Sequence, residues 1–243
     1  MLHFLSKLIV LSSLFVYMTA FAKGHKQYTV SFTVNHGVTD KVLYQGSEDV
    51  SHRDGKIYKT TKYFDLNEKL SLEEEAIFTE ENIALEFYSY HNHQNGAQTI
   101  AKRNGQKISI SYREGPESQS ERGTLEWKKN SVHGRSFHEV ILRDWQKLVD
   151  GLDTEFSLML LYRFKSVDFR ISPINLKNAP QTEPKHYHFA LEPSNFFIRQ
   201  FVPEMTFVYS GGKEPKIISF TGPTGLLVDG KQEQKVVVKF KYQ

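Results

Sequence analysis

Apolar and polar residues alternate with a period of two along most of the chain. The stretch QYTVSFTVNHG places apolar side chains at every second position, namely Tyr28, Val30, Phe32 and Val34. β-branched and aromatic residues in this pattern predict a half-buried strand. Similar runs recur to the end of the chain, among them KHYHFALEP, FFIRQFVPEMTFVYS, PKIISFTG and QKVVVKFKYQ. The pattern therefore predicts a mainly β protein.

Turn signals separate these strand-like runs. Asn104-Gly105 and Asp54-Gly55 each stand between two such runs. An Asn-Gly or Asp-Gly pair suits the positive φ angles of a two-residue type I′ hairpin. The glutamate-rich stretch LSLEEEAIFTEENIALEFYSY is ambiguous between helix and strand, and we predict two strands joined at residues 80–82. Segment 156–162 is apolar on both faces, which predicts a central strand covered on both sides.

The segment SFHEVILRDWQKLVDG departs from this pattern. Its apolar residues recur at helical spacing and form one stripe, made of Phe137, Val140, Ile141, Trp145, Leu148 and Val149. Ser136 followed by Glu139 matches a capping box, and Gly151 is well placed to end a helix. We predict a helix over residues 137–150.

A helix of this length is marginal in water, so its apolar face must pack on the sheet. The sequence therefore predicts a curved antiparallel sheet or unclosed β-barrel packed around one central amphipathic helix. The alternative is a closed sandwich or barrel with the helix capping one end. A Pro- and Asn-containing connection near residue 180 is followed by only about 65 residues, so one domain over 23–243 is the simpler expectation.

The first 22 residues have the order of a bacterial signal peptide. Lys7 supplies positive charge, an apolar stretch runs from Leu8 to Met18, and Ala20-Phe21-Ala22 offers a cleavage site. An N-terminal membrane anchor is the alternative, but the stretch is shorter than the roughly 20 residues that span a bilayer. Later segments also lack that length of apolar sequence. We expect an exported, periplasmic protein without an integral membrane segment after cleavage.

Composition narrows the function classes. Without residues 1–22 the chain carries 30 basic and 28 acidic residues, a near-balance that argues against nucleic-acid binding. It has no cysteine, which fits the bacterial periplasm and excludes a cysteine nucleophile or a thiolate metal site. The sequence also lacks a G-x-S-x-G elbow, a Walker phosphate loop and an H-E-x-x-H zinc helix. We expect a non-catalytic protein that needs no cofactor.

The export signal, the repeated antiparallel strands, the central helix and the absence of cysteine resemble bacterial periplasmic lipoprotein carriers of the LolA-like type. Those proteins fold as an unclosed barrel whose mouth is covered by helical segments. The ending FVPEMTFVYSGGKEPKIISFTGPTGLLVDGKQEQKVVVKFKY also resembles the tail of uncharacterised periplasmic β proteins. This chain has fewer helices than a typical carrier. The resemblance implies a role in handling an apolar ligand or a lipoprotein.

The helix stripe and the strand behind it supply the candidate ligand-binding residues. We predict that a cavity is lined by Phe137, Ile141, Trp145, Leu148, Leu160 and Arg163. An arginine in an apolar strand can anchor a ligand carboxylate or phosphate. A salt bridge with Asp168 or exposure near the sheet edge is the alternative for Arg163, and tryptophan is more often simply core.

Two His-x-His pairs are the candidates for a metal site, His91 with His93 and His186 with His188. Alternate residues of a strand share a face, so neighbouring strands would bring four imidazoles together. Surface histidines without a ligand are the alternative. A Ser136–His138–Asp144 triad is disfavoured because triad members normally come from separate elements.

Three functions follow from these observations. The leading hypothesis is a non-catalytic periplasmic protein that binds an apolar or amphipathic ligand, such as a lipid or lipoprotein, or an envelope protein partner. The second is an interaction module of the envelope with a filled core and an exposed apolar patch or sheet edge. The third is a histidine-metal enzyme.

Overall fold

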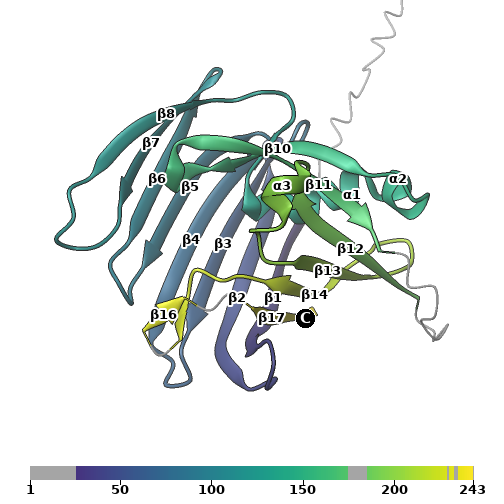
Figure 1. The fold of residues 1–243 in the computed structure, drawn as a ribbon, viewed down its shortest axis with the longest axis horizontal. Coiled ribbons are helices and arrows are strands. Elements are labelled where there is room, and N and C mark those ends of the chain that lie inside the picture. Colours follow the sequence, from purple (N-terminus) through teal and green to yellow (C-terminus); the bar gives the residue numbers. More distant parts are fainter. Residues whose placement is uncertain (1–25, 175–184, 229, 233–234, 243) are drawn as a thin grey trace, which may run out of the picture.

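A computed structural model describes residues 26–174, 185–228, 230–232 and 235–242. These residues form one large curved sheet of 15 strands and a separate two-stranded ribbon (Figure 1). The first eight strands of the sheet are β1 (Lys26–His36), β2 (Val42–Arg53), β3 (Lys56–Phe64), β4 (Leu70–Thr79), β5 (Leu85–Asn92), β6 (Gln98–Asn104), β7 (Lys107–Arg113) and β8 (Glu121–Glu126). The other seven are β9 (Ser131–Val132), β10 (Thr154–Leu160), β11 (Lys165–Pro173), β12 (His186–Pro193), β13 (Met205–Ser210), β14 (Ile217–Gly222) and β17 (Val236–Tyr242).

The sheet is unclosed, with β8 at one end of the strand order and β9 at the other. It runs β8-β7-β6-β5-β4-β3-β2-β1-β17-β14-β13-β12-β11-β10-β9, so the first and last strands of the chain pair in its middle. Neighbours are antiparallel except β9 and β10, which are parallel. The predicted mainly β, curved and unclosed architecture is confirmed.

The predicted hairpins are present, with one change of turn. Asp54 and Gly55 both have positive φ, at 52° and 69°, between β2 and β3, as a type I′ turn requires. Between β6 and β7 the turn lies one residue later than predicted. Asn104 pairs with Lys107, and Gly105 has a φ of 61° at the first central position, which is the place of glycine in a type II′ turn. Strands β4 and β5 meet near residues 80–82, also as predicted.

The helical segment is not one helix over 137–150. After a 3-10 turn, η1 (Gly134–Ser136), it forms α1 (Phe137–Arg143) and α2 (Trp145–Val149), interrupted at Asp144. So short a helix has little stability of its own to keep it continuous. Trp145, the first residue of α2, packs edge-on against the rings of Tyr187 and Phe189.

The predictions for the two ends of this helical segment have different outcomes. The prediction of a capping box is wrong, because the Ser136 hydroxyl donates to the His133 carbonyl at 2.8 Å and does not cap α1. The C-terminal prediction is confirmed. Gly151 has a φ of 89° and donates to the Leu148 carbonyl, and Leu152 donates to the Lys147 carbonyl, which is a Schellman motif.

Strand β10 corrects the prediction of a central strand. It lies next to the two-residue edge strand β9, yet it has buried residues on both of its faces. Phe156 and Leu158 pack into one core with α1 and α2, whereas Met159 packs against the inner face of β5–β8. The next turn, η2 (Leu161–Arg163), continues that contact. The sheet therefore rolls up so that β10 and η2 pack against β5–β8, although no described strands pair between these two parts of the sheet.

A connecting segment covers the other part of the inner face. The ribbon of β15 (Leu227–Val228) and β16 (Lys231–Gln232) follows the fully buried Leu226, which packs in a third core with Phe32, Tyr44 and Leu72. Asn92 donates to the Gly225 carbonyl at 3.0 Å and so holds the segment in place. Within the described ranges no helix is long and apolar enough to cross a membrane.

Candidate functional site

The residues predicted to line a cavity under the helix are packed against one another and against the sheet. Ile141 and Leu148 are fully buried. The Phe137 ring lies 5.9 Å from the Phe156 ring and 5.8 Å from the Phe207 ring. Trp145 lies edge-on to Tyr187 at 5.1 Å. Aromatic rings therefore occupy the space beneath Trp145.

Leu160 and Arg163, the other two residues predicted to line a cavity, lie in different surroundings. Leu160 packs against the same core as the helices. Arg163 is exposed in η2, with its guanidinium 5.3 Å from the centre of the Tyr162 ring. The exposed alternative for Arg163 thus holds, and a role of these residues in ligand binding stays a prediction.

A cluster of charged side chains lies between the inner face of the sheet and the helical segment. We call it the inner charge cluster, and its members are Glu48, Lys59, Glu74, Arg135 and Glu139. Three of them come from neighbouring strands β2, β3 and β4, and two come from η1 and α1. Sequence reasoning missed this cluster, because nothing local distinguishes an inward lysine or glutamate from a solvent-facing one.

Each charge of the inner charge cluster has a partner. The Lys59 ammonium lies 2.7 Å from the Glu139 carboxylate and donates to the Arg135 carbonyl at 3.0 Å, and its side chain is only 3% exposed. The Arg135 guanidinium contacts Glu48 and the Thr61 hydroxyl, and lies 3.6 Å from Glu74. The cluster ties η1 and α1 to the sheet.

Electrostatics keep Glu48 and Arg135 of the inner charge cluster ionised. Burial raises the pKa of Glu48, but Lys59 and Arg135, with the Thr61 hydrogen bond, outweigh it and lower that pKa to about 2. Burial lowers the pKa of Arg135, and the carboxylates of Glu48 and Glu74 outweigh it and raise that pKa. Because its charges are paired with each other, the cluster serves as a clamp within the fold.

Ser136, His138 and Asp144 do not form a triad, as expected from their spacing. Ser136 is fully buried with its hydroxyl on the His133 carbonyl. His138 lies 3.0 Å from the Tyr209 hydroxyl through Nδ1, and Asp144 binds the Arg143 guanidinium at 2.8 Å. The three side chains thus serve three different partners.

An aromatic patch stands out on the surface. It consists of Phe196, Phe197, Ile198 and Phe201, which are 63%, 74%, 42% and 86% exposed. The first three lie on the short helix α3 (Phe196–Arg199), which follows β12 and packs against it (Figure 1). The sequence FFIRQFVPEMTFVYS was predicted to be strand throughout, and only Met205–Ser210 is. The signal for α3 was Asn195, a favourable N-cap residue directly before the apolar run.

The two histidine pairs do not meet. His91 and His93 lie on and just after β5, His186 and His188 lie on β12, and seven strands stand between them in the sheet. Four converging imidazoles would have required β5 and β12 to be neighbours, and they are not. The first pair instead meets a carboxylate, that of Glu73 on β4.

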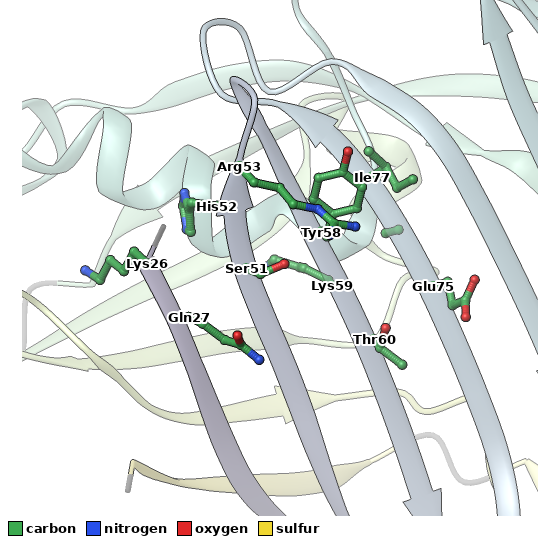
Figure 2. Close-up of a pocket in the computed structure, with 11 residues that line it drawn as sticks. Lys26, Gln27, Ser51, His52, Arg53, Tyr58, Lys59, Thr60, Glu75 and Ile77 are labelled. Atoms are coloured by element: carbon green, nitrogen blue, oxygen red, sulfur yellow. The ribbon is translucent and has the colours of Figure 1, made fainter. Parts of the chain in front are cut away.

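Two hollows on the outer face of the sheet are open to solvent. The first has a volume of about 520 Å³ and lies over one end of β1–β4 (Figure 2). The Arg53 guanidinium lies 4.2 Å from the centre of the Tyr58 ring there. The second, of about 500 Å³, lies over β1, β2 and β17. Neither is an enclosed apolar cavity of the kind expected for a lipid carrier.

Comparison of the chain with protein-family models, with characterised proteins and with solved structures finds no match. The resemblance to lipoprotein carriers thus stays a prediction from the sequence pattern. Function must be argued from the geometry of this chain.

Proposed function

We propose that the protein is a non-catalytic protein of the cell envelope that binds the surface of a lipid membrane through the aromatic patch. One observation carries the proposal. Four neighbouring large apolar side chains project into solvent from one turn of helix and the residues after it. Single exposed apolar residues are ordinary, but a contiguous patch of this kind marks an interaction surface.

Polar contacts at the base of the aromatic patch hold it outward. The Asn195 side chain accepts from the Phe197 N–H at 2.8 Å and from the Ile198 N–H at 3.4 Å. The Arg199 guanidinium lies 3.2 Å from the Glu192 carboxylate and donates to the Pro193 carbonyl at 3.3 Å. The apolar tips therefore stay exposed while the charge beside them is neutralised.

The size and chemistry of the aromatic patch favour a lipid surface over a protein partner. At roughly 150–200 Å² for a large side chain, it offers on the order of 500 Å². A standard protein interface needs about 800 Å² on each partner. Phenylalanine side chains enter the boundary between headgroups and acyl chains without a matching pocket. The sequence from Ser194 to Pro203 contains no acidic residue that anionic headgroups would repel.

The packing of aromatic rings beneath Trp145 also supports a surface function. A carrier needs an enclosed space for acyl chains, whereas aromatic rings fill the region beneath Trp145. The proposed periplasmic location, which rests on residues 1–22, would place the aromatic patch next to a membrane.

Flotation of the purified chain with vesicles of phosphatidylethanolamine and phosphatidylglycerol tests the proposal. Combining Phe197→Ser and Phe201→Ser removes roughly 2–3 kcal/mol of apolar transfer free energy, so vesicle affinity should fall at least about tenfold. The control combines Leu66→Ser and Leu152→Ser, which are also exposed but lie outside the patch. It should bind vesicles as the wild type does.

The N-terminal segment is the same in all three proteins, so the comparison reports on the aromatic patch. The proposal is contradicted when the wild type fails to float, or when the patch variant floats as well as the control. Lipid that stays bound through detergent-free purification, seen by native mass spectrometry, would favour an enclosed carrier site.

A further inference from the structure

We propose that Glu73, His91 and His93 form a binding site for one divalent transition-metal ion such as Zn²⁺. The site lies on the outer face of β4 and β5. It is independent of the membrane function proposed above, since it uses another part of the sheet.

Strand register brings the three side chains together. Glu73 on β4 is the cross-strand partner of His91 on β5. His93 follows two residues later, and its N–H donates to the Ser71 carbonyl at 2.9 Å, which continues the pairing past the end of β5. Residues two apart on a strand share a face, so both imidazoles stand beside the one carboxylate. Their ring centres are 3.9 Å apart.

The distances are close to those of a metal centre. Oε1 of Glu73 lies 3.2 Å from Nε2 of His93 and 3.8 Å from Nδ1 of His91. All three ligand atoms lie within 4.8 Å of one another. Ligands about 2.0–2.1 Å from a tetrahedral ion are separated by roughly 3.3–3.4 Å. Small side-chain rotations would therefore complete the site, and its partial exposure leaves an entry path and positions for solvent ligands.

The ligand types indicate which ions fit. Imidazole suits zinc, copper and nickel, and one carboxylate adds negative charge without shifting the preference to calcium or magnesium.

Neighbouring cationic side chains should lower the affinity of the site for a metal ion. Lys62 on β3 is the cross-strand partner of Glu73. Gln98 on β6 is the cross-strand partner of His91, and Arg113 on β7 is the partner of Gln98. The two cations of this row disfavour a further positive charge, so the affinity should be moderate. An ordinary Glu–His ion pair is the competing explanation, and it predicts no binding of metal.

The second histidine pair provides a control within the same chain. His186 and His188 also alternate on a strand, but their partners on β13 are Ser210 and Val208. They have the same spacing, but among the residues that the structure describes no carboxylate joins them in a three-ligand group. Any difference between the two pairs therefore reports on the three-ligand arrangement.

Calorimetric titration of ZnCl₂ into the untagged, EDTA-stripped full chain tests the site. The wild type and the variant with His186→Ala and His188→Ala should bind one Zn²⁺ with equal affinity. The variant with His91→Ala and His93→Ala should lose this binding. Glu73→Gln should weaken it by about tenfold or more, because a ligand charge is removed. These side chains are on the outer face, and circular dichroism will verify that the variants fold.

Thermal unfolding gives a second readout. Zn²⁺ should raise the melting temperature of the wild type and of the His186/His188 variant, but not of the His91/His93 variant. The proposal is overturned if the wild type binds no Zn²⁺, or if the His91/His93 variant binds it as the wild type does. Unchanged affinity in Glu73→Gln would also overturn the three-ligand site.

Discussion

At the scale of single residues, His133 shows what burial does to a side chain. It precedes η1, where its Nδ1 accepts from the Arg135 N–H at 3.4 Å, and its ring lies 4.2 Å from that of Tyr88. Burial, together with the Arg135 charge, lowers its pKa from 6.5 to about 3. The sequence places a histidine just before the helical segment but does not reveal that it is enclosed.

This pKa shift predicts loss of stability in mild acid. Between pH 6.5 and about 3 the unfolded chain binds a proton at His133 that the folded chain excludes. The free energy of unfolding should therefore fall by about 1.4 kcal/mol for each pH unit below 6.5. His133→Asn keeps a capping side chain without the titration, so its stability should fall by about 1.6 kcal/mol less than that of the wild type between pH 6.5 and 5.

Urea unfolding at pH 7.5, 6.5 and 5 measures the difference. Glu48 does not interfere in this range, because its lowered pKa makes its contribution fall only below about pH 4.5. The other histidines are common to both proteins. Equal pH dependence in wild type and variant would show that His133 is not the group responsible.

At the scale of elements, the inner charge cluster decides how the helical segment sits on the sheet. Lys59 on β3 pairs with Glu139 on α1, and Arg135 of η1 pairs with Glu48 and Glu74. The apolar stripe correctly indicated which helix face is buried. Glu139 is not part of that stripe, yet it contacts Lys59 of the sheet and its side chain is only 11% exposed.

Removing Lys59 should loosen this attachment. Lys59→Met leaves the largely covered Glu139 carboxylate without its cation, so the free energy of unfolding should fall by about 3–5 kcal/mol. Amide hydrogen exchange should also quicken across α1. Lys62→Met is the matched control on the outer face of the same strand, and it should change stability by less than about 0.5 kcal/mol. Similar losses for both variants would contradict the clamp.

At the scale of the whole molecule, the rolled sheet depends on a close approach between its two ends. Gly123 on β8 lies against the ring of Phe164, which follows η2 with a left-handed φ of 50°. A Cβ on Gly123 would come 2.4 Å from the Phe164 ring. Here glycine provides space for another segment, since its own φ is not positive.

Filling that space should separate the two ends of the sheet. Gly123→Ala should lower the free energy of unfolding by about 1–3 kcal/mol through overpacking. The same change should cost less in a Phe164→Ala background, and a double-mutant cycle by urea unfolding measures this coupling. Gly115→Ala is the control, because a Cβ there meets only ordinary contacts. Additive effects at 123 and 164 would argue against the contact.

The sequence by itself determined the strands, the hairpin at Asp54-Gly55, the helical character of residues 137–149 and the end at Gly151. These features depend on alternation and turn chemistry among residues near one another in the chain. Only the tertiary structure decided that β1 pairs with β17, that β10 lies near an edge, that Lys59 is buried, and that Glu73 meets His91. Those outcomes depend on strand register and sheet curvature, which sum weak preferences over residues far apart and leave no mark in any short segment.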